Sequence, residues 1–282
     1  MTTEKTGNIT TILVVHNEEN FIRRCLESVK NLSGEIIVIH DGKCLDNSLK
    51  IASEFTNKVY EGQRYGCLEP HLIDALYTLK NDWILRLDPD EHLSDELIDH
   101  ISKLDLGSTL FKYFKAKWRE WNEGVISKQS PYEEKIVLFN KKNIVSIGLP
   151  NYAIVSTTGQ GITLNGYLEH TPVHVNYGFK EWVLKRVKPM VISEAKLRYP
   201  GPIKVYPNNL KFIPRKIILR NKYPILTLPI FALNVYFKYL YGLRRARTLF
   251  IFKRQFILAH AYLFSQILLS YYMAKEKYKK PI

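Results

Sequence analysis

The chain has 282 residues, 46% of them hydrophobic and 24% charged, which is typical of a folded protein and excludes a largely disordered chain. The formal net charge of +14 is divided unevenly: residues 1–106 carry 11 Lys/Arg against 19 Asp/Glu, and residues 107–282 carry 30 against 8. A basic region can bind nucleic acid, anionic lipid or phosphorylated substrates, and charge alone does not choose among them. The division therefore predicts two regions with different partners.

Strand and helix patterns alternate over the first hundred residues. Apolar runs rich in β-branched residues predict strands, and apolar residues at helical spacing predict helices between them. In chain order the predicted elements are Ile9–Val15 (strand), Glu19–Leu32 (helix), Glu35–Ile39 (strand), Asp46–Phe55 (helix), Lys58–Tyr60 (strand), Pro70–Leu79 (helix) and Trp83–Leu87 (strand). Because the longer strands are almost continuously apolar, the repeat predicts a parallel sheet covered by helices on both faces.

The pattern changes after residue 107. Leu110–Trp118 alternates apolar and basic residues, as an antiparallel or edge strand would, and Ile136–Phe139 and Ile162–Leu168 are similar. Gly178–Lys196 has a helical pattern. Prolines between residues 200 and 214 then predict a linker, which precedes an apolar and basic stretch over Tyr223–Ala274.

Polar side chains follow three of the predicted strands. They are His16–Glu19 after the first strand, His40–Gly42 after the second and Asp88–Glu91 after the fourth. The carboxyl ends of parallel strands meet at one edge of the sheet, where open α/β sheets bind their ligands. We therefore expect the three loops to lie close together.

Asp88 and Asp90 are separated only by a proline, so both carboxylates can face one hard cation. Mg²⁺ or Mn²⁺ prefers such ligands, completed by water and a diphosphate. The alternative is that the acids merely begin a turn, and that Ser94, Asp95 and Glu96 favour the start of the next helix. The position of the pair after a buried strand, with polar residues after two other strands, favours the cation site.

Three segments together resemble a known family. TTILVVHNEENFIRRCLESV, EIIVIHDGKCLDNSLKIA and DWILRLDPDEHLSDEL are similar, in order and spacing, to the sequence blocks of family 2 glycosyltransferases of the GT-A fold. The likeness is greatest to the branch that adds sugars to lipopolysaccharide cores and related glycolipids. It covers about residues 9–100 and continues more weakly through residues 166–185. It implies an α/β fold with a mostly parallel, Rossmann-like sheet and flanking helices, followed by a basic amphipathic helical region.

The resemblance implies how a nucleotide-diphosphate sugar donor is bound. The expected donor-binding residues are His16, Asn17, Glu18, Asp41, Arg64 and Asp88. The first three would border the nucleotide base, and Asp41 would recognise the base or ribose, with His40 in place of the family's first acid. Arg64 is the nearest cation for the diphosphate, because Glu69-Pro70-His71 replaces the family's usual Arg-Asn pair.

The metal and the general base are implied in the same way. Asp88 and Asp90 match the family's D-x-D, which binds Mg²⁺ or Mn²⁺ with the diphosphate, and His170 matches a histidine that completes the metal shell or contacts the diphosphate. A histidine at a strand end is also often structural, and both interpretations of His170 stay open. Inverting transfer needs a general base for the acceptor hydroxyl.

The family's acid or His-Glu pair in the second half is replaced here by Pro150-Asn151-Tyr152. The base candidates are therefore Glu169, His170 and Glu134, with Glu133 as a further possibility.

Three regions are expected. Residues 1–106 would form the nucleotide-sugar-binding half of the GT-A domain, residues 107–200 the acceptor-side half, and residues 201–282 a basic, apolar, membrane-associating helical region. Gln255–Ala274 lacks a formal charge over 20 residues, barely enough to span a bilayer. Helices lying in the membrane interface are favoured over a spanning helix or over helices packed on the catalytic domain.

The sequence thus predicts a metal-dependent glycosyltransferase that uses a lipid-linked or glycan acceptor. We expect it to be cytoplasmic, peripheral on the inner face of the cell membrane through anionic lipids, and not to bind nucleic acid. One alternative, a nucleotidyltransferase, needs a glycine-rich basic loop after the first strand, where His16–Glu19 is acidic and lacks glycine. The other is a degenerate, non-catalytic glycosyltransferase-like protein or a basic binding module.

Overall fold

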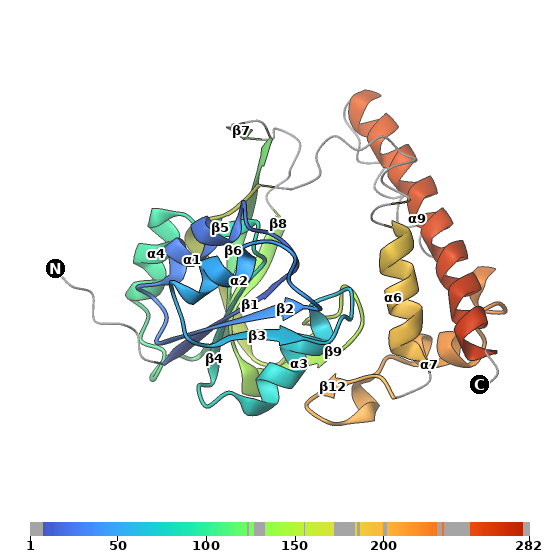
Figure 1. Cartoon of the computed structure of the whole chain (residues 1–282), viewed down its shortest axis with the longest axis horizontal. Coiled ribbons are helices and arrows are strands. Elements are labelled where there is room, and N and C mark those ends of the chain that lie inside the picture. The colour runs from blue at the N-terminus through green and yellow to red at the C-terminus, as the bar shows by residue number, and fades with distance from the viewer. Residues whose placement is uncertain are drawn as a thin grey trace. The chain divides into compact units, whose positions relative to one another are not determined.

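The computed structural model describes residues 8–122, 124–126, 133–154, 156–171, 184, 187–199, 202–229, 233 and 249–278. The chain forms two compact units, which are described separately. The sheet unit comprises residues 1–147, 151–176 and 206–208, and the helical unit comprises residues 148–150, 177–205 and 209–282. Figure 1 shows the chain coloured from its blue N-terminus to its red C-terminus.

Four parallel strands form the first half of the sheet, in the order β3-β2-β1-β4. Their bounds are β1 Ile9–Val15, β2 Glu35–Asp41, β3 Val59–Gly62 and β4 Trp83–Leu87. β1, β2 and β4 were predicted from their apolar runs, and β1 and β4 have the predicted bounds; the short third strand predicted at Lys58–Tyr60 is seen as β3. The parallel arrangement of these strands is confirmed.

Helices cover both faces of this half, as the alternating pattern predicts. They are α1 Ile22–Val29, α2 Ser48–Ser53 and α3 Glu69–Thr78. The buried stripe of α1, which includes Cys25 and Leu26, belongs to one apolar core, and Leu72 and Leu76 of α3 belong to a second core with Ile12 and other sheet residues. Two separate cores on opposite sides of β1 are what alternating side chains of a doubly covered strand produce.

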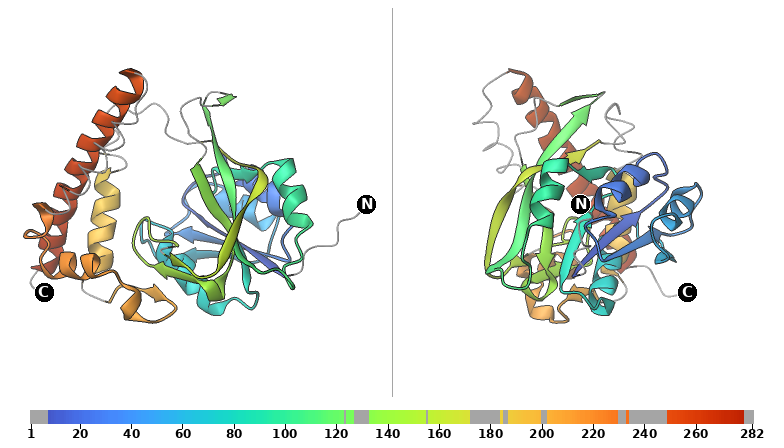
Figure 2. Two further views of the ribbon diagram at one scale, coloured as in Figure 1. Left: turned by 180° about the vertical axis from the view of Figure 1, so that it is seen from behind. Right: turned by 90° about the vertical axis from the view of Figure 1, so that its left-hand side faces the viewer.

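The second half of the sheet is mixed. It contains β5 Glu91–Leu93, β6 Phe111–Asn122, β7 Val125–Ile126, β8 Glu133–Asn140 and β11 Gln160–His170. The order continues β4-β8-β6-β11-β5, with β8 antiparallel to both β4 and β6, and β11 parallel to β6. The antiparallel pairing expected after residue 107 is confirmed for β6 and β8, which are the green strands of Figure 2. β5 had no strand signal in the sequence; it pairs antiparallel with β11, which sets His170 opposite Glu91.

A helix and a short hairpin-like pair complete the sheet unit. Helix α4 (Asp95–Ser102) begins at Ser94, whose hydroxyl accepts a hydrogen bond from the Leu97 amide at 3.3 Å, so the predicted helix start is confirmed. Gly166 has φ +95°, and a Cβ there would lie 2.4 Å from the Leu97 nitrogen. Only glycine allows β11 to pass α4 this closely. After the 3₁₀ turn η1 (Lys141–Asn143), β9 (Ile144–Ile147) pairs antiparallel with β10 (Ser156–Thr157).

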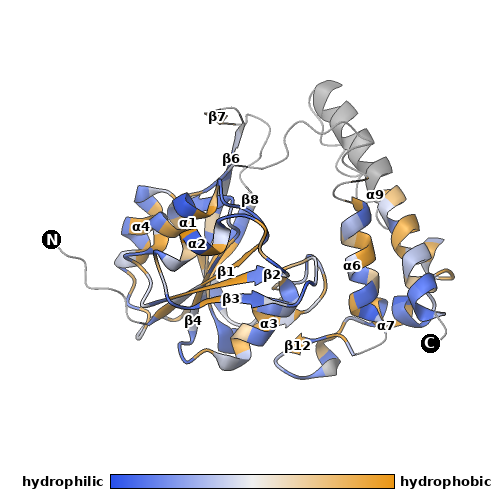
Figure 3. Cartoon of the chain, viewed as in Figure 1, coloured by the Kyte–Doolittle hydropathy of each residue, from blue (hydrophilic) through white to orange (hydrophobic). Residues whose placement is uncertain are grey.

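The helical unit is organised around two packed helices. Its elements are α6 Lys188–Arg198, η3 Leu210–Phe212, α7 Arg215–Lys222 and α9 Leu249–Lys277, and the short strand β12 spans Val205–Tyr206. Val191 and Ala195 of α6 form an apolar cluster with Leu269 and Met273 of α9. In Figure 3, α6 and the coloured part of α9 carry orange hydrophobic stretches interspersed with blue hydrophilic ones. The helix predicted from residue 178 is seen as α6, and residues 178–183 lie outside the described part of the chain.

Within the described residues, no helix combines the length and the apolar character that crossing a bilayer requires.

Candidate functional site

The loops after β1, β2 and β4 begin at one edge of the sheet. The parallel registers place Val15 beside His40 and Leu13 beside Leu87, so the three strands end together. This confirms that the polar segments predicted after these strands begin side by side.

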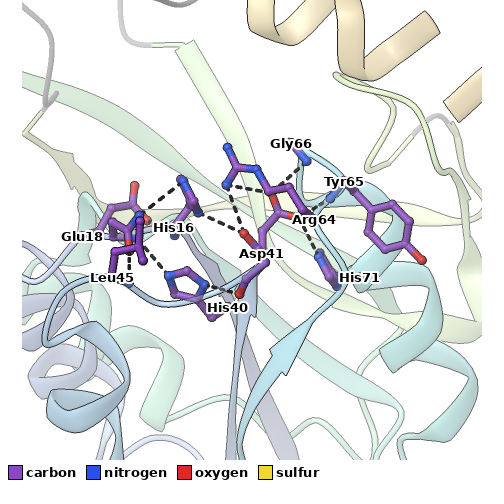
Figure 4. A network of polar contacts seen from close by, with 11 residues as sticks. His16, Glu18, His40, Asp41, Leu45, Arg64, Tyr65, Gly66 and His71 are labelled. Atoms are coloured by element: carbon purple, nitrogen blue, oxygen red, sulfur yellow. Dashed lines mark hydrogen bonds and ion pairs between the residues drawn. The ribbon is translucent and has the colours of Figure 1, made fainter. Parts of the chain in front are cut away.

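His40 joins the first two loops (Figure 4). It is fully buried; its Nε2 accepts a hydrogen bond from the Asn17 amide at 3.1 Å, and its Nδ1 lies 2.7 Å from the Gly42 carbonyl oxygen. An amide N–H can only donate and a carbonyl can only accept, so these bonds assign the ring proton to Nδ1. A carboxylate could not donate to Gly42, which gives a physical reason for a histidine at the position of the family's first acid.

Further hydrogen bonds fix the loop that was predicted to border a nucleotide base. The Glu18 amide donates to Ser48 Oγ at 2.7 Å, and Asn17 Oδ1 accepts from the Leu45 amide at 2.8 Å. Asn17 has φ +56°, a left-handed conformation that asparagine tolerates better than most residues. His16 Nδ1 lies 3.0 Å from the Asp41 carbonyl oxygen. The loop is therefore held in one shape by the chain itself.

Asp41 lies in a pocket of donors (Figure 4). Its carboxylate accepts hydrogen bonds from the amides of Tyr65 (2.6 Å) and Gly66 (2.8 Å) and lies 2.9 Å from His71 Nε2. Arg64 reaches it at 3.4 Å and also donates to its carbonyl oxygen at 3.0 Å. Burial alone raises the pKa of Asp41, but these hydrogen bonds and the Arg64 charge outweigh burial and lower it.

Asp41 therefore anchors the loop that carries Arg64. The Arg64 side chain is 52% exposed, in contrast to the buried Asp41, so its guanidinium lies at the surface of this edge. Recognition of a base or ribose by Asp41 stays a prediction. His71 was noted in the sequence only as a departure from the family pattern, and the structure shows that it is the buried partner of Asp41.

Two of the departures from the family pattern, Glu69-Pro70-His71 and Pro150-Asn151-Tyr152, contact each other. Glu69, at the start of α3, is 4% exposed, and its Oε1 accepts a hydrogen bond from the Asn151 amide at 2.7 Å. Asn151 has φ +68°, a left-handed conformation, and its hydrogen bond to Glu69 holds the backbone of the Pro150-Asn151-Tyr152 segment in this turn. Burial raises the pKa of Glu69. The segment that lacks the family's acid is thus bound to an acid that comes from another part of the chain.

The acidic turn after β4 contains an unexpected cation, Lys135 of β8. Its Nζ lies 2.7 Å from Asp88 Oδ2 and 2.6 and 2.7 Å from the two carboxylate oxygens of Glu91. Arg86 lies 3.6 Å from the same Asp88 oxygen. Glu91, which is 2% exposed, also accepts hydrogen bonds from the Asp88 amide and from Trp118 Nε1, both at 3.0 Å.

Asp90 and His170 meet on the other side of this turn. Asp90 Oδ2 lies 3.2 Å from His170 Nε2, and the Thr171 amide donates to the Asp90 carbonyl oxygen at 3.0 Å. The His170 ring stacks on Trp118 with centroids 4.4 Å apart. His170 Nδ1 is buried and has no hydrogen-bond partner among the described residues. The pairing of β5 with β11 therefore brings His170 to the turn, as the resemblance implies.

The charges of the turn affect the ionisation of its acids. Burial raises the pKa of Asp88, but the charges of Lys135 and Arg86 outweigh this and lower it. Burial and the negative charge of Asp88 raise the pKa of Glu91. Burial, together with the charges of Asp90 and Asp88, raises the pKa of Glu18 to about 7. The first loop and the acidic turn begin at the same edge of the sheet, which brings Glu18 within range of both charges.

The donor atoms of the turn fit a metal that is shared with a phosphate ligand. In the described part of the chain, no three or more His, Cys, Asp or Glu side chains are grouped so as to hold a metal ion. Asp88 and Asp90 nevertheless supply two carboxylates at a sheet edge. Mg²⁺ is commonly bound by one or two carboxylates, with substrate phosphates and waters completing its shell. The residue types therefore fit Mg²⁺ or Mn²⁺ without an all-protein cage.

The base candidates lie in different surroundings. Glu169 is 4% exposed and forms a two-pronged ion pair with Arg119 and a hydrogen bond with Trp121; burial raises its pKa, but these partners outweigh burial and lower it. Glu134 is exposed and accepts hydrogen bonds from Thr163 (2.8 Å) and Lys115 (3.1 Å). The side chain of Glu133 lies outside the described residues. His170 is the candidate that contacts the acidic turn, and the catalytic assignments stay predictions.

Lys135 was missed in the sequence, although its neighbour Glu134 was named. Successive residues of a strand point to opposite faces, so Glu134 faces solvent while Lys135 faces the acids. Lys135 lies opposite Ala116, whose small side chain leaves room for it. The available sequence signal was that Lys135 stands between two acids, Glu133 and Glu134, and a strongly apolar run. It could be interpreted only once β8 was known to lie beside β4.

Comparisons with known proteins agree with the resemblance. The family model described as Glycosyl transferase family 2 matches residues 10–157, just over half of the chain. An uncharacterized glycosyltransferase of Rickettsia bellii is 32% identical over 141 residues, covering 49% of this chain and 47% of the relative. One from Rickettsia typhi is 36% identical over 94 residues, covering 33% and 31%. The chain thus spans about half, or less, of the length of the curated relatives it matches.

Similar solved structures are more distant. TarS 1–349 of S. aureus in complex with UDP-GlcNAc is 15% identical, with 66% of each chain covered and a TM-score of 0.45. The mannosyltransferase PcManGT of Pyrobaculum calidifontis in complex with GDP-Man and Mn²⁺ is 14% identical, covering 97% of this chain and 88% of that one, with a TM-score of 0.44. Likenesses at this level carry no argument about the site.

Proposed function

The chain belongs to glycosyl transferase family 2, and from this premise we propose that it transfers a sugar from a nucleotide-diphosphate donor to a lipid-linked or cell-surface glycan acceptor. The observation that carries the proposal is the gathering of three polar loops at the carboxyl edge of parallel strands, with Asp88 and Asp90 in one of them. This is where open α/β sheets bind nucleotides.

The donor would lie across the first two loops. His16, Asn17 and Glu18 form a preorganised wall for the nucleotide base, and burial and the charge of Arg64 lower the pKa of His16, which favours a neutral imidazole there. The exposed guanidinium of Arg64, held by Asp41, would pair with the diphosphate. A loop that is already ordered loses little conformational entropy when the donor binds.

Asp88 and Asp90 would hold Mg²⁺ or Mn²⁺, which when bound supplies Lewis-acid stabilisation of the leaving diphosphate. His170, against Asp90 and stacked on Trp118, would keep Asp90 oriented or complete the metal shell. The transfer would proceed with inversion, and the acceptor proton would pass to a base among Glu169, His170 and Glu134.

The helical unit would hold the protein at the inner face of the cell membrane. On α9, Phe264, Ile267 and Tyr271 share one exposed face by their spacing of three and four residues, while Leu269 and Met273 pack against α6. Exposed apolar side chains on a basic helical region are typical of helices that lie in an anionic membrane interface. A lipid-linked acceptor would then be reached in the plane of the membrane.

The membrane part is tested by sedimentation with vesicles of phosphatidylglycerol and phosphatidylethanolamine. The double variant Ile267→Glu/Tyr271→Glu should lower the bound fraction about tenfold, because it removes apolar contact and adds two negative charges. Lys80→Glu in the sheet unit changes the net charge by the same amount and is the matched control. Equal binding of all three proteins would refute the membrane surface.

Donor binding is tested by a thermal-shift screen of UDP, GDP, CDP and their sugar conjugates, with Mn²⁺ or with EDTA. A ligand that binds only the native state raises the melting temperature, so at least one nucleotide diphosphate should do so in Mn²⁺. If no nucleotide stabilises the protein under either condition, the proposed function is wrong.

One observation favours a second candidate function. The segment that lacks the family's acid, around Asn151, is tied to the buried Glu69. A protein with this arrangement could bind the sugar donor without transferring the sugar. If the protein binds a nucleotide but neither transfers the sugar of the selected donor nor slowly hydrolyses that donor, it is this non-catalytic form.

A further inference from the structure

Lys135 Nζ lies at the centre of the acidic turn, where a dication would be expected. Its Nζ lies 2.6–2.7 Å from three carboxylate oxygens, one from Asp88 and two from Glu91. The side chain is 23% exposed. In this structure Lys135 is therefore paired with two carboxylates of the acidic turn.

The carboxylates of the turn are already partly neutralised. Asp88, Asp90 and Glu91 contribute three acidic groups, and Lys135 and Arg86 contribute two permanent positive charges within 3.6 Å of Asp88. A divalent ion that bound Asp88 through Oδ2 would have to displace Lys135. One that bound through the other oxygen would lie within a few ångströms of the ammonium charge, at a large Coulomb cost.

Glu91 gives the lysine a second binding position. Two of the three contacts of Lys135 are to Glu91, which is buried and fixed by Trp118 and by the Asp88 amide. Lys135 can therefore release Asp88 and keep its remaining partners. When a ligand takes the place of Lys135 on Asp88, Lys135 loses one of its three contacts and keeps the two to Glu91. Its charge is therefore not left buried without a partner.

We infer that Lys135 is an internal counter-ion of the acidic turn, which a divalent metal must displace from Asp88. This inference rests on the proposed function. The inference implies an order of binding: the turn binds metal weakly on its own and strongly together with a diphosphate. The negative charges of the diphosphate offset the positive charges of Lys135 and Arg86. Lys135 is thus a positioning residue that couples metal uptake to the presence of the donor.

The test measures Mn²⁺ binding in the absence of nucleotide, by isothermal titration calorimetry and by the electron paramagnetic resonance signal of free Mn²⁺. Lys135→Gln should bind Mn²⁺ about tenfold more tightly than the wild type, since removing the competing charge leaves Asp88 free. Lys115→Gln is the matched control, because Lys115 forms an ion pair with the exposed Glu134 and does not contact the turn. It should bind Mn²⁺ as the wild type does.

A second variant covers the case in which Lys135→Gln does not fold. Lys135→Met/Glu91→Gln removes the buried charge pair together, a replacement that proteins often tolerate, and should also tighten Mn²⁺ binding. Unchanged or weaker Mn²⁺ binding in the folded variants would overturn the inference. The wild-type response to UDP and GDP is read separately by thermal shift, so a failure of donor binding is distinguished from a failure of the Lys135 inference.

Discussion

Asp41 ends β2 and Asp88 follows β4, the two strands that flank β1 in the sheet, yet their carboxylates have different partners. Asp41 accepts hydrogen bonds from the backbone amides of Tyr65 and Gly66 and lies against the buried His71, with one side-chain cation, Arg64, farther away at 3.4 Å. Asp88 is bound by the tips of Lys135 and Arg86, which are flexible side chains.

The difference separates a structural acid from an exchangeable one. Removing the partners of Asp41 would require the loop after β3 to open, whereas a ligand can take the place of Lys135 by a rotation of one side chain. Fixed backbone donors hold a permanent structure, and mobile cations hold a site ready for a ligand. We therefore expect Asp41 to contribute to stability and the turn at Asp88 and Asp90 to contribute to the chemistry.

The largest expected effect tests whether the acidic turn takes part in the chemistry. Asp90→Asn should lower sugar transfer, or hydrolysis of the donor selected by thermal shift, by about 100-fold or more, because it removes a carboxylate proposed to bind the metal. Its melting temperature should stay near that of the wild type. The exposed Asp99, which pairs with Lys103, provides the control Asp99→Asn, expected to be fully active. Normal turnover by folded Asp90→Asn would remove the turn from the mechanism.

The structural side is tested by Asp41→Asn. The amide keeps one acceptor oxygen and turns an NH₂ group toward donors, so we expect the free energy of unfolding in urea to fall by about 3 kcal/mol. Asp82→Asn breaks an exposed pair with Lys142 and should cost less than about 1 kcal/mol. Similar losses for both variants would contradict the structural role of Asp41.

The smallest effect concerns Glu18, whose pKa is raised by burial and by the charges of Asp90 and Asp88. Because its pKa in the folded protein is about 7 and therefore above that of a free glutamate, stability is lost as the pH rises from about 4.5 through 7. Glu18→Gln should unfold like the wild type at pH 4.5 and be more stable by about 2 kcal/mol at pH 8, measured by urea unfolding. If the unfolding free energies of Glu18→Gln and the wild type differ by the same amount at both pH values, ionisation of Glu18 does not destabilise the folded protein.

Much of the fold could be predicted because its strands are long apolar runs. β1 and β4 have the predicted bounds, and the helices between them were correctly placed, although α1 and α2 were predicted too long. The reason for α1 is local: the Glu18 carbonyl accepts hydrogen bonds from the amides of Phe21 and Ile22, so a turn precedes the helix. β5 was not predictable, since its three residues become a strand only through pairing with β11.

The site could be predicted where its signal is local in sequence. Asp88 and Asp90 follow a strand within a few residues, and His170 was placed by the resemblance. Lys135 and His71 could not be assigned, because their partners lie 47 and 30 residues away along the chain. Such contacts depend on which strands become neighbours, and no periodicity in the sequence encodes that.

The most direct measurement is anomalous diffraction at the manganese edge from crystals grown with Mn²⁺ and the nucleotide diphosphate that the screen selects. The account predicts one Mn²⁺ at about 2.2 Å from a carboxylate oxygen of Asp88 or Asp90 and from diphosphate oxygens, with Lys135 withdrawn from Asp88 toward Glu91. A nucleotide bound away from the carboxyl ends of β1, β2 and β4, or a diphosphate without contact to the acidic turn, would contradict it.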